Sequence, residues 1–222
     1  MSAIFGEGLA SVELPTLIFS AIAAVLYLYL VNKPVSVRRT STKVLSIGLL
    51  AVLAYVTGGP ALLIAALVLS ALGDAFLAQR QEEPFFLAGL GSFLIAHVLY
   101  IALFISAFSW TEFVSVSHGI LAIGMIILAA FALKKLWPVA GKMLPAVCAY
   151  TAAILLMGLV SLGVPIDYLF VGAVLFMVSD LTLAGELFLL SPNDSRRRFT
   201  TPFVWVTYYG AQVTLTLLIL TH

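Results

Sequence analysis

Residues 58–78 read GGPALLIAALVLSALGDAFLA, which is a turn followed by a long, largely apolar segment. The first three residues, Gly-Gly-Pro, are turn residues, and a proline suits the first position of a helix. Residues 61–71 are then apolar on every face, as are residues 171–178 further along the chain. Strands of an outer-membrane barrel would alternate apolar and polar side chains. These stretches therefore exclude a barrel and predict helices that cross a membrane.

The composition of the whole chain points to the same class. Of 222 residues, 63% are hydrophobic and 9% are charged, whereas soluble domains have about 45–50% and about 25%. This excludes a soluble globular fold. The formal net charge is +1, and the sequence has no long basic tract that would bind nucleic acid. At about 20 residues per crossing, spans and loops use the whole chain, so we expect one transmembrane helical domain over residues 1–222.

Eight apolar segments are long enough to be transmembrane helices, which predicts an all-α polytopic membrane protein. The predicted spans lie near residues 14–31, 44–57, 60–79, 85–107, 117–136, 142–161, 166–190 and 200–221. All eleven Lys and Arg then fall on one side of the membrane: eight lie in loops, and Lys134, Lys135 and Lys142 stand at the span ends that flank the fifth loop. Joining the second and third spans would instead put Arg80 on the other side. Because basic loops stay in the cytoplasm, we expect both termini on the opposite side, and the short loops favour a bacterial inner membrane.

Two aspartates lie inside these predicted spans, at matching positions of a weak internal repeat. Residues 72–78, LGDAFLA, align with residues 178–184, VSDLTLA, so that Asp74 corresponds to Asp180. With four spans in each half the repeats would be parallel, an arrangement known from transporters. A carboxylate in hydrocarbon marks a functional site unless it only holds helices together. Because no Lys or Arg is expected inside a span, each aspartate should face a polar cavity or keep its proton.

Further polar side chains in the spans are candidates for the same site. His97 and Tyr100 share a face of the fourth span, and Tyr209 and Gln212 share a stripe of the eighth span. Glu186 is near a helix end, from which its side chain can reach the membrane interface. His97 is the only histidine well inside a span, and no cysteine or glutamate lies at a ligand spacing from it, so we expect no metal ion.

Two membrane carboxylates without a metal suit acid–base hydrolysis. One carboxyl keeps its proton and acts as the acid, and an ionised neighbour acts as the base. A proton-coupled small-molecule transporter fits the repeat and the buried acids equally well, and a structural subunit is a third alternative. An intramembrane aspartyl protease is disfavoured, because Ala71-Leu72-Gly73 precedes Asp74 and neither aspartate follows a tyrosine.

Four segments, in order along the chain, carry a resemblance to a known family. They are SALGDAFL at 70–77, FLAGLGSFLIAHVLY at 86–100, GAVLFMVSDLTLA at 172–184 and YYGAQ at 208–212. With these segments the chain resembles the lysoplasmalogenase (YhhN-like) family of polytopic membrane proteins over residues 43–212. The family's Lys-Pro motif near the first loop has two competing matches, Lys33-Pro34 and Thr42-Lys43, which leaves the role of Lys43 open.

The resemblance implies hydrolysis of the vinyl ether bond of a lysoplasmalogen, a 1-alkenyl-glycerophosphoethanolamine or 1-alkenyl-glycerophosphocholine. The products would be a fatty aldehyde and the glycerophospho-alcohol. The partners would be this lysophospholipid, water and membrane lipids, with no cofactor. Asp74 and Asp180 would be the catalytic residues. The substrate-binding candidates are His97, Tyr100, Tyr209, Gln212 and Arg80, with the loop 196–198 as a second candidate for the phosphate.

Overall fold

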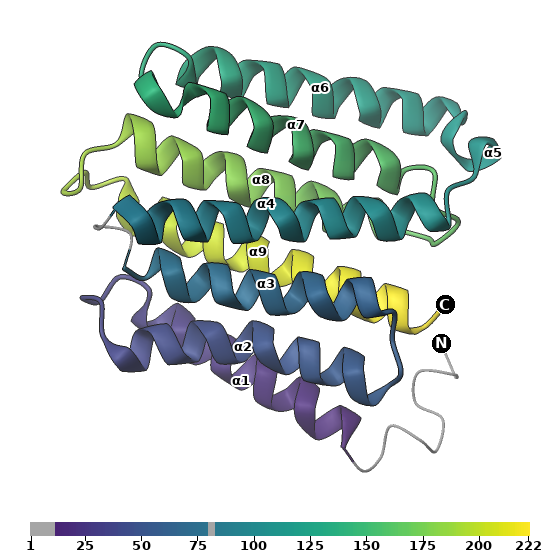
Figure 1. The fold of residues 1–222 in the computed structure, drawn as a ribbon, viewed down its shortest axis with the longest axis horizontal. Coiled ribbons are helices and arrows are strands. Elements are labelled where there is room, and N and C mark those ends of the chain that lie inside the picture. The colour runs from purple at the N-terminus through teal and green to yellow at the C-terminus, as the bar shows by residue number, and fades with distance from the viewer. Residues whose placement is uncertain (1–11, 80–82) are drawn as a thin grey trace. The chain divides into compact units, whose positions relative to one another are not determined.

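The computed structural model describes residues 12–79 and 83–222, which form helices joined by turns, with no strand among them. The elements are α1 (Glu13–Leu30), α2 (Val37–Val56), α3 (Ala61–Leu77), α4 (Glu83–Ser106), α5 (Trp110–Phe113), α6 (Val116–Leu136), η1 (Gly141–Met143), α7 (Leu144–Ser161), α8 (Leu169–Leu189) and α9 (Arg197–Leu220) (Figure 1). Seven helices in the described ranges are long and apolar enough to cross a membrane, and the 17-residue α3 is a shorter apolar helix. The protein is therefore an all-α, multi-pass membrane protein, as the composition predicts.

The second and third predicted spans are separate helices, and the turn residues between them are the reason. Gly58 adopts the left-handed conformation, with φ +71°, which glycine accepts without strain. The N–H of Gly59 donates to the carbonyl oxygen of Ala54 and closes the end of α2. Pro60 then stands immediately before α3. The predicted break between these two helices is confirmed.

The start of α2 differs from the prediction. The helix begins at Val37 rather than near residue 44, because the Ser36 hydroxyl accepts a hydrogen bond from the N–H of Arg39 and caps it. The cap brings three basic residues into a candidate membrane span, namely Arg38, Arg39 and Lys43. The expectation that no Lys or Arg lies inside a span is therefore wrong, and the hydropathy pattern missed it because this first part of α2 is not apolar.

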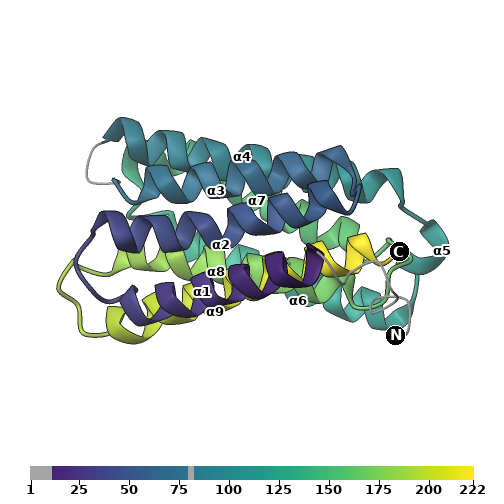
Figure 2. The same cartoon turned by 90° about the horizontal axis from the view of Figure 1, so that it is seen from below.

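The chain divides into two compact units, and the first consists of Met1–Tyr100 with Gln212–His222. In this unit α2 packs against both α1 and α3, and the first part of α4 runs beside α3 (Figure 2). Two glycines hold α3 and α4 close together. A Cβ atom at Gly73 would lie 2.7 Å from the ring of Phe93, and one at Gly89 would lie 2.7 Å from the side chain of Leu77.

This close approach predicts that Gly73→Ala destabilises the protein, because the methyl group would displace the buried ring of Phe93. Overpacking of this kind costs about 1–3 kcal/mol. Gly91→Ala on α4 is the matched control, because nothing lies within 4 Å of a Cβ there. Because alanine favours the helix over glycine, Gly91→Ala should raise the free energy of unfolding by up to about 1 kcal/mol. Thermal unfolding in detergent checks both variants, and equal melting temperatures would contradict the packing argument.

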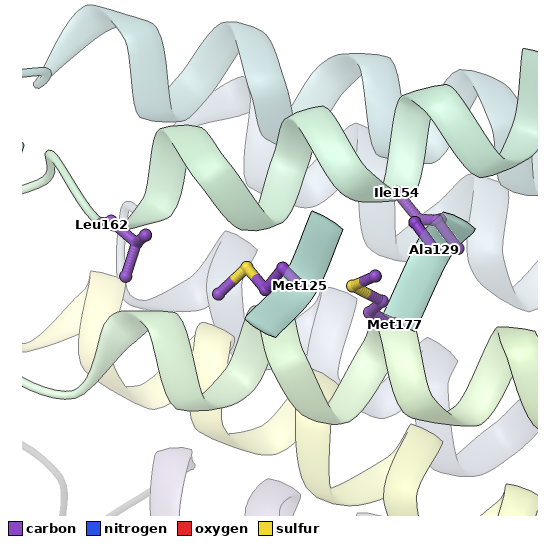
Figure 3. Packing of buried hydrophobic residues seen from close by; sticks show 5 residues of the cluster. All are labelled: Met125, Ala129, Ile154, Leu162 and Met177. Atoms are coloured by element: carbon purple, nitrogen blue, oxygen red, sulfur yellow. The ribbon is translucent and has the colours of Figure 1, made fainter. Parts of the chain in front are cut away.

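The second unit, Ile101–Ala211, contains a cluster of buried apolar side chains. Its helices α6, α7 and α8 pack against one another. The buried side chains of this cluster are Met125 and Ala129 of α6, Ile154 of α7, Leu162 immediately after α7, and Met177 of α8 (Figure 3). A charged group inside this unit therefore needs a specific partner. The single domain over residues 1–222 and the parallel repeat of four and four helices stay predictions.

Candidate functional site

An ion pair lies in the interior of the first unit. Asp74 on α3 is buried, and its Oδ1 is 2.7 Å from the Nζ of Lys43 on α2. The same Nζ lies 5.7 Å from the centre of the Tyr27 ring on α1, a distance at which the ring face attracts a cation. Lys43 keeps 21% of its side chain exposed, whereas Asp74 exposes none. The sequence analysis expected Asp74 to face a polar cavity or to keep its proton. In the structure, the ammonium group of Lys43 compensates its charge instead.

Polar residues of α4 and α9 also lie inside the first unit. His97 and Tyr100 are fully buried on α4, as is Gln212 on α9. The Tyr100 hydroxyl donates a 2.6 Å hydrogen bond to the Oε1 of Gln212. The Nδ1 of His97 is 2.7 Å from the carbonyl oxygen of Phe93, so Nδ1 carries the proton and Nε2 is the acceptor nitrogen of the neutral ring. The structure brings together two of the predicted substrate-binding residues, Tyr100 and Gln212.

The second aspartate belongs to the second unit and has a different environment. Asp180 on α8 is 8% exposed, and its Oδ2 accepts a 2.7 Å hydrogen bond from the Tyr150 hydroxyl on α7. The preceding residue, Ser179, donates to the carbonyl oxygen of Val204 on α9. The small residues that precede the two aspartates therefore have different structural roles. Gly73 admits a ring, whereas Ser179 joins two helices. Nothing in the sequence singled out Tyr150.

Tyr209 lies in an aromatic group of the second unit. Its ring stacks on Trp205, with the ring centres 5.7 Å apart, and Trp205 also contacts Tyr208. Tyr208 in turn meets the ring of Phe176 on α8 edge to face at 5.4 Å. Tyr209 is half-buried, so it is the part of this group that a ligand can still reach. Arg80, the remaining predicted substrate-binding residue, lies outside the described residues.

Glu186 is bonded within the protein, whereas the sequence suggested a side chain extended to the membrane interface. Its side chain is buried near the end of α8, where the hydroxyls of Thr200 and Thr201 on α9 donate to its Oε1. The guanidinium of Arg197 is 3.9 Å from its Oε2 and donates to the carbonyl oxygens of Glu186 and Leu190. Arg197 therefore completes the C-terminal end of α8, where a cation is favourable.

Residues 196–198 are not wholly a loop as predicted, because α9 begins at Arg197. Arg196 and Arg198 also have protein partners. Arg196 forms hydrogen bonds of 2.7 and 3.0 Å with the carboxylate of Asp194. These bonds lower the pKa of Asp194 to about 2, so the pair is lost only when the pH falls through that value. The guanidinium of Arg198 lies over the ring of Phe199 at 4.5 Å. A phosphate bound at Arg196 would therefore compete with Asp194.

A comparison of the sequence with models of protein families finds a match over most of the chain. The model of the YhhN family matches residues 38–219. The chain belongs to the YhhN family. This YhhN protein is also 33% identical over 162 residues to "Lysoplasmalogenase TMEM86A" of Bos taurus, an alignment that covers 68% of its own length and 62% of the bovine protein. The aligned part is thus less than two thirds of that relative. No solved structure matches the chain.

The family match includes every residue of the two aspartate environments on α2, α3, α7 and α8. Lys43, which the sequence left without a role, lies within it together with its partner Asp74. The buried Glu186 lies within it as well. Within residues 12–79 and 83–222, no group of three or more His, Cys, Asp or Glu side chains is placed to hold a metal ion.

Proposed function

We propose that this YhhN-family protein is a lysoplasmalogenase, a membrane hydrolase that cleaves the vinyl ether bond of 1-alkenyl-lysophospholipids. The observation that carries the proposal is the buried carboxylate of Asp74, which is paired with Lys43 inside a membrane helix bundle. Charged groups in such positions are rare and mark functional sites. The name of the bovine relative, a lysoplasmalogenase, supplies the reaction.

The chemistry of a vinyl ether suits carboxyl groups. A proton is transferred to the β-carbon of the double bond, whose π electrons form the new C–H bond, and the α-carbon becomes an oxocarbenium ion. Water then adds to the α-carbon and loses a proton to a base. The hemiacetal hydroxyl then loses its proton and forms the C=O bond, while the bond to the glycerol oxygen breaks and that oxygen takes up a proton. The products are the fatty aldehyde and the glycerophospho-alcohol. The reaction therefore needs one proton donor and one ionised group that stabilises the cation and accepts the proton of water.

We assign these two roles by environment. An ammonium 2.7 Å from Asp74 stabilises its ionised form, so Asp74 is the base and the group that stabilises the cation. Asp180, which accepts a hydrogen bond from a neutral phenol, is the proton donor. His97, with its acceptor Nε2, and Gln212 would orient water or the glycerol oxygens. Tyr209 would contact the substrate from the aromatic group of α9.

The phosphate of the substrate is assigned to the basic side of the membrane. Arg80 and Arg196 are the candidates there, since Arg197 is used at the end of α8.

We also propose eight crossings, with α3 as the shortest. Its 17 residues span about 25 Å at 1.5 Å per residue, close to the roughly 30 Å of a bilayer core. Eight crossings leave the basic loops in the cytoplasm of a bacterial cell and both termini outside. The parallel repeat gains support from the position of the aspartates, because each lies on the third long helix of its unit, α3 and α8.

The test is aldehyde release by the purified protein in detergent. The substrate is a 1-alkenyl-glycerophosphoethanolamine, and the matched control lipid carries a saturated 1-alkyl ether instead. We expect fatty aldehyde from the first lipid and none from the second, because a saturated ether has no π bond to accept a proton. The same protein is also tested with the choline head group. Absence of aldehyde with both alkenyl lipids would overturn the proposal.

A proton-coupled transporter is the second candidate, because a buried Lys–Asp pair is also typical of proton pathways. It predicts uptake driven by a pH gradient in sealed vesicles that contain the protein. A hydrolase predicts aldehyde release that is independent of any gradient. The two assays on one preparation therefore separate these functions.

A further inference from the structure

Three side-chain atoms inside the first unit have no hydrogen-bond partner among the described residues. They are the Oγ of Ser70 on α3, and the Nε2 of Gln212 and the Oγ1 of Thr216 on α9. Each of these side chains is fully buried. More than nine-tenths of buried polar groups in proteins are hydrogen-bonded, and an exception calls for an explanation such as a ligand or a bound water. Three exceptions in one compact unit point to a binding site.

The orientation of Gln212 is fixed by a neighbour. The Tyr100 hydroxyl donates to its Oε1 at 2.6 Å, so the amide cannot turn over without losing this bond. The NH₂ group, which only donates, is thereby held in the interior. An acceptor oxygen is the group that Nε2 requires.

The depths of these atoms follow from the helices that carry them. Residues four apart share a helix face, so Gln212 and Thr216 lie on one face of α9, and Ser70 shares a face of α3 with Asp74. The end of α9 meets the start of α3, because a Cβ at Gly59 would touch the side chain of Leu220. From that point, at 1.5 Å per residue, Ser70 is about 17 Å along α3, Gln212 about 12 Å along α9 and Thr216 about 6 Å. Gln212 is therefore at an intermediate depth, within about 6 Å of the level of each hydroxyl.

We infer that Gln212, Thr216 and Ser70 form a subsite for an alcohol hydroxyl, and that its ligand is the free sn-2 hydroxyl of the lysophospholipid. This inference rests on the proposed function. An alcohol both donates and accepts hydrogen bonds. Its oxygen can accept a hydrogen bond from the amide N–H of Gln212, and its O–H can donate one to the hydroxyl oxygen of Thr216 or Ser70. An acylated sn-2 oxygen has no proton to give and carries a chain. The subsite would therefore select the lyso form of the lipid.

The test compares two substrates in the detergent-purified protein. One is the 1-alkenyl-lysophosphoethanolamine and the other is its 2-deoxy analogue, which lacks only the sn-2 hydroxyl. Sites built to bind a hydroxyl reject the analogue without it by up to about 10⁴–10⁵-fold, and we expect wild type to prefer the lysolipid by about 10²-fold or more in kcat/KM. In Gln212→Met and Thr216→Val this ratio should fall towards one.

The control variant is Thr214→Val, a half-buried threonine between the two test positions on α9, which should keep the ratio of wild type. Folding is checked by thermal unfolding. Thr216→Val removes a hydroxyl that bonds to no described residue, so its melting temperature should be unchanged or higher while the ratio falls. A purely structural hydroxyl would not produce that combination.

The remaining outcomes overturn the inference in distinguishable ways. If Gln212→Met and Thr216→Val lower kcat/KM equally for both lipids, the polar atoms hold a water molecule or position other groups, and they do not bind the sn-2 hydroxyl. If wild type hydrolyses both lipids equally well, the subsite does not exist. If wild type releases no aldehyde from either lipid, the proposed function fails and the subsite fails with it.

Discussion

Replacing either membrane aspartate by asparagine is expected to lower kcat for aldehyde release by about 10²–10⁴-fold, the usual contribution of a positioned acid or base. An amide in place of the Asp180 carboxyl has no acidic proton to give to carbon. An amide in place of the Asp74 carboxylate carries no charge to stabilise an oxocarbenium ion or to accept the proton of water. The measurement is the initial rate of aldehyde formation by each variant and by wild type at saturating lysolipid.

Two controls make this result specific. Asp167→Asn changes an exposed carboxylate in the same chain and should leave kcat unchanged. Tyr150→Phe removes the hydrogen bond to Asp180 but keeps the carboxyl group of Asp180. It should therefore lower kcat by less than Asp180→Asn does. If a folded Asp74→Asn or Asp180→Asn variant retains the rate of wild type, the mechanism with two carboxylates is wrong even where the activity itself stands.

The helices themselves could be predicted because their signals are local. Apolar segments and the turn residues 58–60 predicted α3 and its separation from α2 within a few residues. The start of α2 could not be found in the same way. It depends on a cap by Ser36 and on a basic first turn, and a search for apolar segments passes over both.

The environments of the acidic residues could not be read from the sequence, since they depend on contacts between helices. The pairing of Lys43 with Asp74 needs α2 and α3 packed in a particular rotation. Glu186 stands near a helix end, a position that favours exposure, yet Thr200 and Thr201 of α9 bury it. The sequence shows which polar and charged residues lie in apolar segments and are therefore unusual in a membrane. The packed helices decide which partners they meet.

Lys43→Met is expected to destabilise the protein by about 3 kcal/mol, because it leaves the carboxylate of Asp74 buried without its cation. Breaking a buried ion pair on one side typically costs about 3–5 kcal/mol, and Lys43 is partly exposed, which places the expected value at the lower end. The measurement is thermal or denaturant unfolding of the purified variant in detergent.

Lys33→Met is the matched control. Its Nζ also lies 5.7 Å from a tyrosine ring, that of Tyr29, but the residue is exposed. The two variants lose similar cation–ring contacts, so the difference between them reports the ion pair with Asp74. We expect Lys33→Met to change the free energy of unfolding by less than about 1 kcal/mol.

The double variant Lys43→Met/Asp74→Asn separates the ion pair from the loss of lysine packing. With the carboxylate replaced by a neutral amide, no unpaired charge is left in the interior, so the double variant should be more stable than Lys43→Met alone. The interaction energy of the cycle should exceed about 1 kcal/mol, as it does for residues in direct contact. Additive effects of the two substitutions would mean that Lys43 and Asp74 do not compensate each other. The ionised role of Asp74 in hydrolysis would then lose its structural basis, whereas strong coupling would support the base function of this aspartate and the positioning function of its lysine.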